Sequence, residues 1–157
     1  MYLFIYRSTQ PKSAMSMFGW GVGDIIAISQ LARNVYAAYK DAPSNYRYIC
    51  EEVMSLHVTV KKAEQHYKSP TLSDNNRQQG QVVLKGCQSV LEDLNSFIEK
   101  YKSLASADKK LVFKKVKLGT EDIATLRARL TSNMVSLNGF IQRFDIDIPT
   151  ITIEYTY

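Results

Sequence analysis

Residues 120–144 read TEDIATLRARLTSNMVSLNGFIQRF, and this stretch decides the fold class. Apolar side chains recur in it at spacings of three and four residues, from Ile123 to Phe144. Because an α-helix turns once every 3.6 residues, this spacing places them on one face. An apolar face has to be buried against another element. We therefore predict a long amphipathic helix over 120–144, with Thr120 as its N-cap.

Three earlier stretches show the same period. They predict helices over 24–40, 44–67 and 74–104, with Asp24 capping the first and Ser73 the third. Four amphipathic helices joined by short loops favour an all-α, up-and-down antiparallel bundle with left-handed packing. The core that we expect consists of Ile25, Ile28, Leu31, Val35, Ile49, Val53, Leu56, Val60, Leu84, Cys87, Leu91, Leu94, Ile98, Ile123, Leu126, Leu130, Leu137 and Ile141.

A lysine-rich stretch, KKLVFKKVK at 109–117, precedes Gly119. We predict a short additional helix of one or two turns here, which Gly119 interrupts. Basic residues near an anionic membrane contribute about 1 kcal/mol each to binding, although the same lysines could form a solvated face. The residues that we expect to contact a membrane or a protein partner are Phe18, Trp20, Lys109, Lys110, Phe113, Lys114, Lys115 and Lys117.

The two ends of the chain lack a helical period. Residues 1–16 are predicted to be a poorly ordered leader, 17–144 the helical-bundle domain, and 145–157 a disordered or extended tail. The glycines that flank Trp20 leave two alternatives for this aromatic segment, docking in a groove or bilayer interface or folding back onto the bundle.

Composition indicates an ordinary globular domain. The chain has 157 residues, of which 45% are hydrophobic and 22% charged, enough for one domain with a real core. No signal peptide or membrane-spanning run is evident, so we expect a cytoplasmic protein, with peripheral membrane association as an alternative. Cys50 and Cys87 occupy helix-like apolar positions and are interpreted as reduced, buried side chains.

The sequence offers little that suggests catalysis. The two histidines, His57 and His66, lack the spacing of a zinc site, and the glycines at 19–23 lack the Gly-Lys-Ser/Thr ending of a phosphate loop. The carboxylates of Glu51 and Glu52 are interpreted as first-turn residues that complement a helix dipole. We expect no enzyme activity, no metal and no cofactor.

The chain resembles the N-terminal helical domain of fungal STAND proteins, the NLR-like receptors that carry NACHT and often ankyrin modules. The resemblance covers about residues 17–144. It is carried by FGWGVGDIIA at 18–27 with NVY at 34–36 and KDAP at 40–43, by EVMSLH at 52–57, and by EDIATLRARLTSN at 121–133. That domain is similar to HeLo-like death-inducing domains.

This resemblance implies a signalling output through oligomerisation or membrane attack. The expected partners are copies of the same domain, related receptors and an anionic membrane surface. Because no nucleotide-binding module follows, an alternative is an inert adaptor or decoy without membrane activity. The net charge of +5 leaves a third alternative, a basic helical domain that binds nucleic acid, although no recognition helix is evident.

Overall fold

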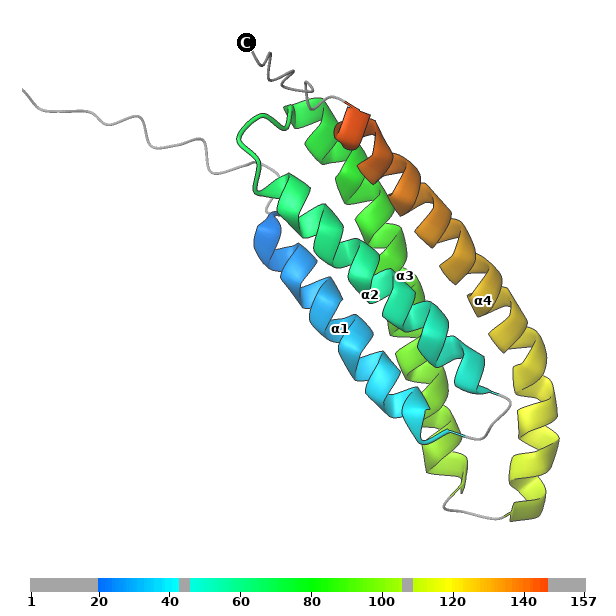
Figure 1. Ribbon diagram of the computed structural model, residues 1–157. Coiled ribbons are helices and arrows are strands. Elements are labelled where there is room, and N and C mark those ends of the chain that lie inside the picture. Colours follow the sequence, from blue (N-terminus) through cyan, green and yellow to red (C-terminus); the bar gives the residue numbers. More distant parts are fainter. Residues whose placement is uncertain (1–19, 43–45, 106–108, 147–157) are drawn as a thin grey trace, which may run out of the picture.

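A computed structural model describes the backbone of residues 20–42, 46–105 and 109–146, and the side chains of these ranges except 104–122 and 145–146. These ranges form four α-helices that run alternately in opposite directions along one axis (Figure 1). They are α1 (Val22–Lys40), α2 (Arg47–Tyr67), α3 (Asp74–Ala105) and α4 (Lys109–Ile146). The predicted all-α bundle is confirmed.

The helices pair in a way that their chain order does not suggest. Helix α1 packs against α2 and α3, and α4 packs against the same two helices. Helices α2 and α3 make few contacts with each other and occupy diagonal corners, although they follow one another in the chain. The bundle therefore consists of two antiparallel hairpins, α1–α2 and α3–α4, joined by a linker at 68–73 that crosses between opposite corners.

The core runs along the seam between these hairpins. Every core residue predicted from the periodicity is buried except Leu31, which is only partly buried against the cluster. The core also contains Tyr39, which was not among the predicted core residues. Its hydroxyl donates a hydrogen bond to the carbonyl oxygen of Leu94 at 2.9 Å. The hydroxyl is thus paired inside an apolar core, where an unpaired one would be costly.

Helix α1 begins earlier than predicted, and Asp24 is not its N-cap. The cap is Gly21, and Asp24 is the third residue of the helix. From there its carboxylate accepts a hydrogen bond from the Gly21 backbone N–H at 2.6 Å. A carboxylate in the first turn also complements the helix dipole. Ser73, by contrast, acts as predicted, since its hydroxyl accepts a hydrogen bond from Asn76 N–H.

The predicted short lysine-rich helix is wrong as a separate element. The backbone is helical without interruption from Lys109 to Ile146, so Gly119 does not break it and Thr120 does not cap a new helix. A glycine inside a helix costs only about 1 kcal/mol relative to alanine, whereas a proline costs about 3. Helix α4 also runs two residues into the predicted tail, whose remainder lies outside the described residues, as does the leader 1–16.

Gly80 allows a close approach of aromatic side chains to α3. A Cβ atom at this position would lie 2.4 Å from both Cζ of Phe140 and the hydroxyl oxygen of Tyr67. A methyl group at Gly139, on α4, would meet nothing within 4 Å. The two helical glycines therefore differ in what surrounds them.

Replacing Gly80 with alanine should destabilise the fold by about 1–3 kcal/mol, because the rings of Tyr67 and Phe140 would have to move. The matched control, Gly139→Ala, should stabilise it by up to about 1 kcal/mol, because alanine is the better helix former. Urea unfolding followed by circular dichroism measures both. Equal stabilisation by the two substitutions would contradict the observed packing at Gly80.

Tyr39 should make stability fall at alkaline pH. Burial raises the pKa of its hydroxyl well above the ordinary 10.0. Above pH 10 the unfolded chain can therefore release a proton that the folded chain retains, and stability falls as pH rises. Between pH 8 and 11 the wild type should lose about 1 kcal/mol that a Tyr39→Phe variant does not lose. Urea unfolding at the two pH values tests this, and an unchanged difference between the proteins would refute it.

Candidate interaction sites

Helices α3 and α4 are much longer than α1 and α2, at 32 and 38 residues against 19 and 21. The Tyr39–Leu94 hydrogen bond places the last turn of α1 beside the middle of α3. Helix α3 continues to Ala105, about 16 Å further at 1.5 Å per residue. Figure 1 shows the ends of α3 and α4 extending past the shorter hairpin. We call residues 102–105 and 109–122 the projecting end.

Residues 109–117 of the projecting end carry a charge equal to the net charge of the whole chain. The chain has twenty basic and fifteen acidic residues, a formal net charge of +5. Residues 109–117 contain five lysines and no acidic residue, so the rest of the chain has fifteen of each and is neutral. The lysine side chains and Phe113 lie outside the described side chains, but the backbone of α4 places these residues on a two-helix extension. An anionic partner would therefore be attracted to one end of the molecule.

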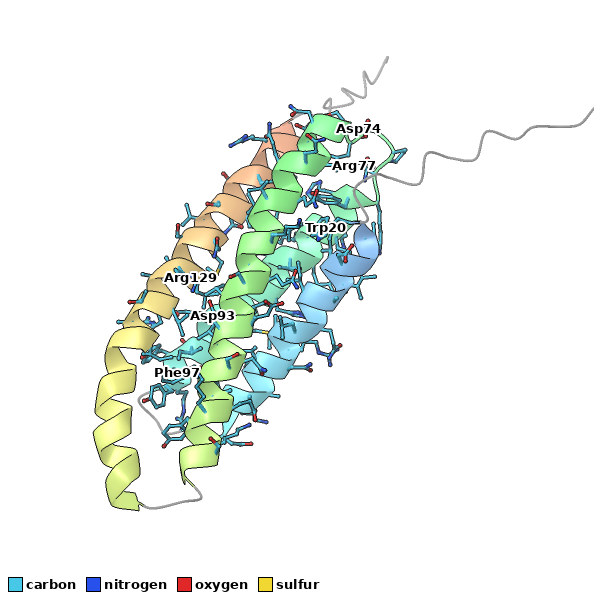
Figure 2. All side chains as sticks on the ribbon, turned by 180° about the vertical axis from the view of Figure 1, so that it is seen from behind. Trp20, Asp74, Arg77, Asp93, Phe97 and Arg129 are labelled. Atoms are coloured by element: carbon cyan, nitrogen blue, oxygen red, sulfur yellow. The ribbon has the colours of Figure 1, made fainter. Side chains whose placement is uncertain are left out.

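Of the two aromatic residues near the N-terminus that were predicted to contact a membrane or a partner, the structure describes one. Phe18 lies outside the described residues. Trp20 is partly buried against the core at the end opposite the projecting end, beside the start of α1 (Figure 2). Its ring packs edge-on against that of Tyr67, with 5.8 Å between centroids. Trp20 thus folds back onto the bundle, one of the two alternatives that its flanking glycines left open.

Tyr67 is the centre of this opposite end. Its ring also lies 6.2 Å from that of Phe140 on α4, and the guanidinium of Arg77 on α3 lies 5.9 Å above it. Its hydroxyl donates to the carbonyl oxygen of Arg77 at 2.5 Å. Burial raises the pKa of Tyr67 to about 12. One side chain of α2 therefore contacts α3, α4 and the segment that leads into α1.

An ion pair joins α2 to α4 within the stretches that carry the family resemblance. Nε of Arg127 donates to both carboxylate oxygens of Glu52 at 3.1 Å, and Nη2 donates to Oε1. The guanidinium also stacks over the Tyr48 ring, 4.0 Å from its centroid. The bond from Glu52 raises the pKa of Arg127. The first-turn interpretation of Glu52 is wrong, since α2 begins at Arg47 and Glu52 pairs across the bundle.

Ser29 and His57 are the nearest approach to a catalytic pair. Nδ1 of His57 lies 3.1 Å from the buried hydroxyl of Ser29 and 3.1 Å from the carbonyl oxygen of the same residue. Either contact ties α1 to α2. Among the described residues, no group of three or more His, Cys, Asp and Glu side chains could hold a metal ion. The two distances show the pair as a contact between α1 and α2.

The two cysteines are free and buried, as interpreted from their positions. Burial raises the pKa of Cys87 to about 12 and also raises that of Cys50. Both thiols therefore stay protonated at neutral pH and pack as small apolar groups. Within the described residues, no helix is both long and apolar enough to cross a membrane.

Comparison with known proteins leaves the family assignment as a hypothesis drawn from the sequence. No protein-family model matches the chain, and neither a curated protein nor a solved structure matches it.

The Glu52–Arg127 pair should stabilise the bundle more than the pair formed by Asp93 and Arg129. The second pair, which joins α3 to α4 (Figure 2), has both side chains more than 40% exposed, whereas Glu52 is 24% exposed. A double-mutant cycle with Glu52→Gln and Arg127→Met should give a coupling energy of about 1 kcal/mol, against about 0.3 for Asp93→Asn with Arg129→Met. Urea unfolding gives both values. Equal coupling energies would show that the lower exposure of Glu52 does not strengthen its pair.

Proposed function

We propose that this chain is a non-catalytic signalling domain of the fungal NLR-like kind, which associates with other copies or related receptor domains and docks its projecting end on an anionic membrane. The resemblance over residues 17–144 supports the first part of the proposal. The observation that carries the second part is the concentration of the net charge in residues 109–117, on a part of α4 that the shorter hairpin does not reach.

A membrane suits the composition of this stretch better than a nucleic acid does. Residues 109–117 interleave the five lysines with Leu111, Val112, Phe113 and Val116. Lysines attract anionic headgroups, and apolar residues among them gain further free energy in the bilayer interface. Phosphate backbones would engage the lysines alone. The same mixture would also suit an acidic protein with an apolar groove, which is what the adaptor alternative requires.

The first experiment combines sedimentation of the full chain with vesicles and release of a trapped dye. Vesicles containing phosphatidylserine are compared with neutral phosphatidylcholine vesicles, with duplex DNA as a competing polyanion. Binding and leakage specific to anionic vesicles support a membrane-acting signalling domain. Binding without leakage reduces the proposal to peripheral docking. A soluble oligomer that ignores both vesicles, or preferential binding to DNA, would overturn the membrane part.

Reversing the charge of Lys114, Lys115 and Lys117 to glutamate should weaken binding to anionic vesicles at least 100-fold, because each basic residue near the surface contributes about 1 kcal/mol. The control is a variant with glutamate at Arg33, Lys62 and Lys85, exposed positions on three different helices, which changes the net charge equally. It should weaken binding much less. Equal losses in the two variants would show that total charge, and not the projecting end, determines binding.

A further inference from the structure

Each of the two hairpins is a packed pair of antiparallel helices, and the two pairs share one core along the seam between them. Helix α1 packs most extensively with α2, and α3 with α4, and each helix pair across the seam packs less extensively than these two. Among the described residues, the chain passes between the hairpins through the linker at 68–73, whose side chains are mostly exposed except for Leu72. Pro70 favours an extended conformation for Ser69, the residue before it. Little of the buried core therefore depends on the path of this linker.

Arg77 holds the linker in its present path. Its Nη1 donates to the carbonyl oxygen of Tyr67 at 3.0 Å, and its Nη2 donates to that of Ser69 at 3.1 Å. These bonds join the first turn of α3 to the end of α2, and Figure 2 shows Arg77 close to Asp74 at the start of α3. The contacts lie beside the linker and do not extend along the seam.

The seam between the hairpins, in contrast, is specific. It contains the Glu52–Arg127 ion pair, the Tyr39–Leu94 hydrogen bond and the edge-on packing of Tyr46 against Phe97 at 6.1 Å. These contacts join α1–α2 to α3–α4 without involving the linker. A hairpin that leaves the seam exposes a large apolar surface, and a second copy of the same hairpin would restore every contact.

We propose that two copies of this chain exchange their α3–α4 hairpins, opening about the linker at 68–73, with Arg77 as the latch that favours the closed monomer. The partner is a second copy because it supplies the identical seam, and exchange of an identical element is a low-cost route to a dimer. The exchange gives a specific structure to the self-association in the proposed function, on which it rests, and it requires neither a membrane nor the projecting end, so its test is independent of membrane docking.

Shortening the linker tests the exchange. Deleting Ser69, Pro70 and Thr71 leaves three residues between Tyr67 and Asp74, which reach at most about 14 Å when fully extended and so have little slack to cross a bundle diagonal of about 11–14 Å and turn back. We expect this variant to be a dimer in analytical ultracentrifugation, with the helical circular dichroism of the wild type. A helical monomer would overturn the proposal.

A charge swap distinguishes an exchanged dimer from two bundles that touch at their surfaces. Glu52→Arg and Arg127→Glu each place like charges across the seam. In an exchanged heterodimer of the two variants, both bundles regain opposite charges, so co-refolding should yield several-fold more heterodimer than homodimers. A surface dimer would give the statistical two-to-one-to-one mixture, which would overturn the proposal. Native mass spectrometry counts the species, and the experiment works with the full-length linker at high concentration if the shortened chain fails to fold.

The latch has a matched control at the same end of the bundle. Arg143 bonds to the side chain of Gln79 within the α3–α4 hairpin, 3.4 Å away, so its loss leaves the linker untouched. Arg77→Met should speed the appearance of dimer from concentrated monomer at least several-fold, whereas Arg143→Met should not. Equal rates for the two variants would remove Arg77 from the proposed role.

Discussion

The unequal length of the two hairpins is the constraint on which the rest of the structure depends. An apolar helical stripe is stable only where another helix covers it, and α2, the helix of the shorter hairpin that packs against α4, has 21 residues against the 38 of α4. The covered part is a buried core that extends past the Tyr39–Leu94 bond and the Glu52–Arg127 pair to Tyr46, Ile98 and Ile123. The part of α4 that the shorter hairpin does not reach includes residues 109–117, which contain five lysines and no acidic residue.

Much of the fold could be predicted from the sequence because helical periodicity is a local property. The spacing from Ile123 to Phe144 specifies which side chains point inward, and nearly all of those predicted are buried. Leu31 is the exception, because its position on α1 is at the margin of the seam. The continuity of α4 could not be predicted, because a single glycine such as Gly119 is compatible with either a helix end or an uninterrupted helix. The helical residues on both sides of it decide between the two. An apolar stripe on a helix also does not specify which helix will cover it. The periodicity therefore could not predict that α2 and α3 occupy diagonal corners.

The candidate sites were less predictable for the same physical reason. Glu52 and Arg127 are far apart in the sequence, and nothing local pairs them, although both belong to the stretches that resemble the fungal family. Arg77 carries no motif, since its importance comes from the two carbonyl oxygens that it reaches. The lysines at 109–117 were evident from composition alone, but their location on an extension of the bundle required the structure. For Trp20, the sequence left two alternatives open, and the structure shows that it packs against the core.

The concentration of lysines at one end also makes the charge distribution along the bundle uneven. A neutral body with five positive charges near one tip has a large dipole moment along its long axis. Under physiological salt, ions screen a surface potential within about 8 Å, whereas residues 109–122 of α4 span about 20 Å along the helix axis. A charged surface would therefore exert a torque only when the tip is already close. The rest of the bundle would remain outside the screened layer, free to meet other proteins without competing for the same anions.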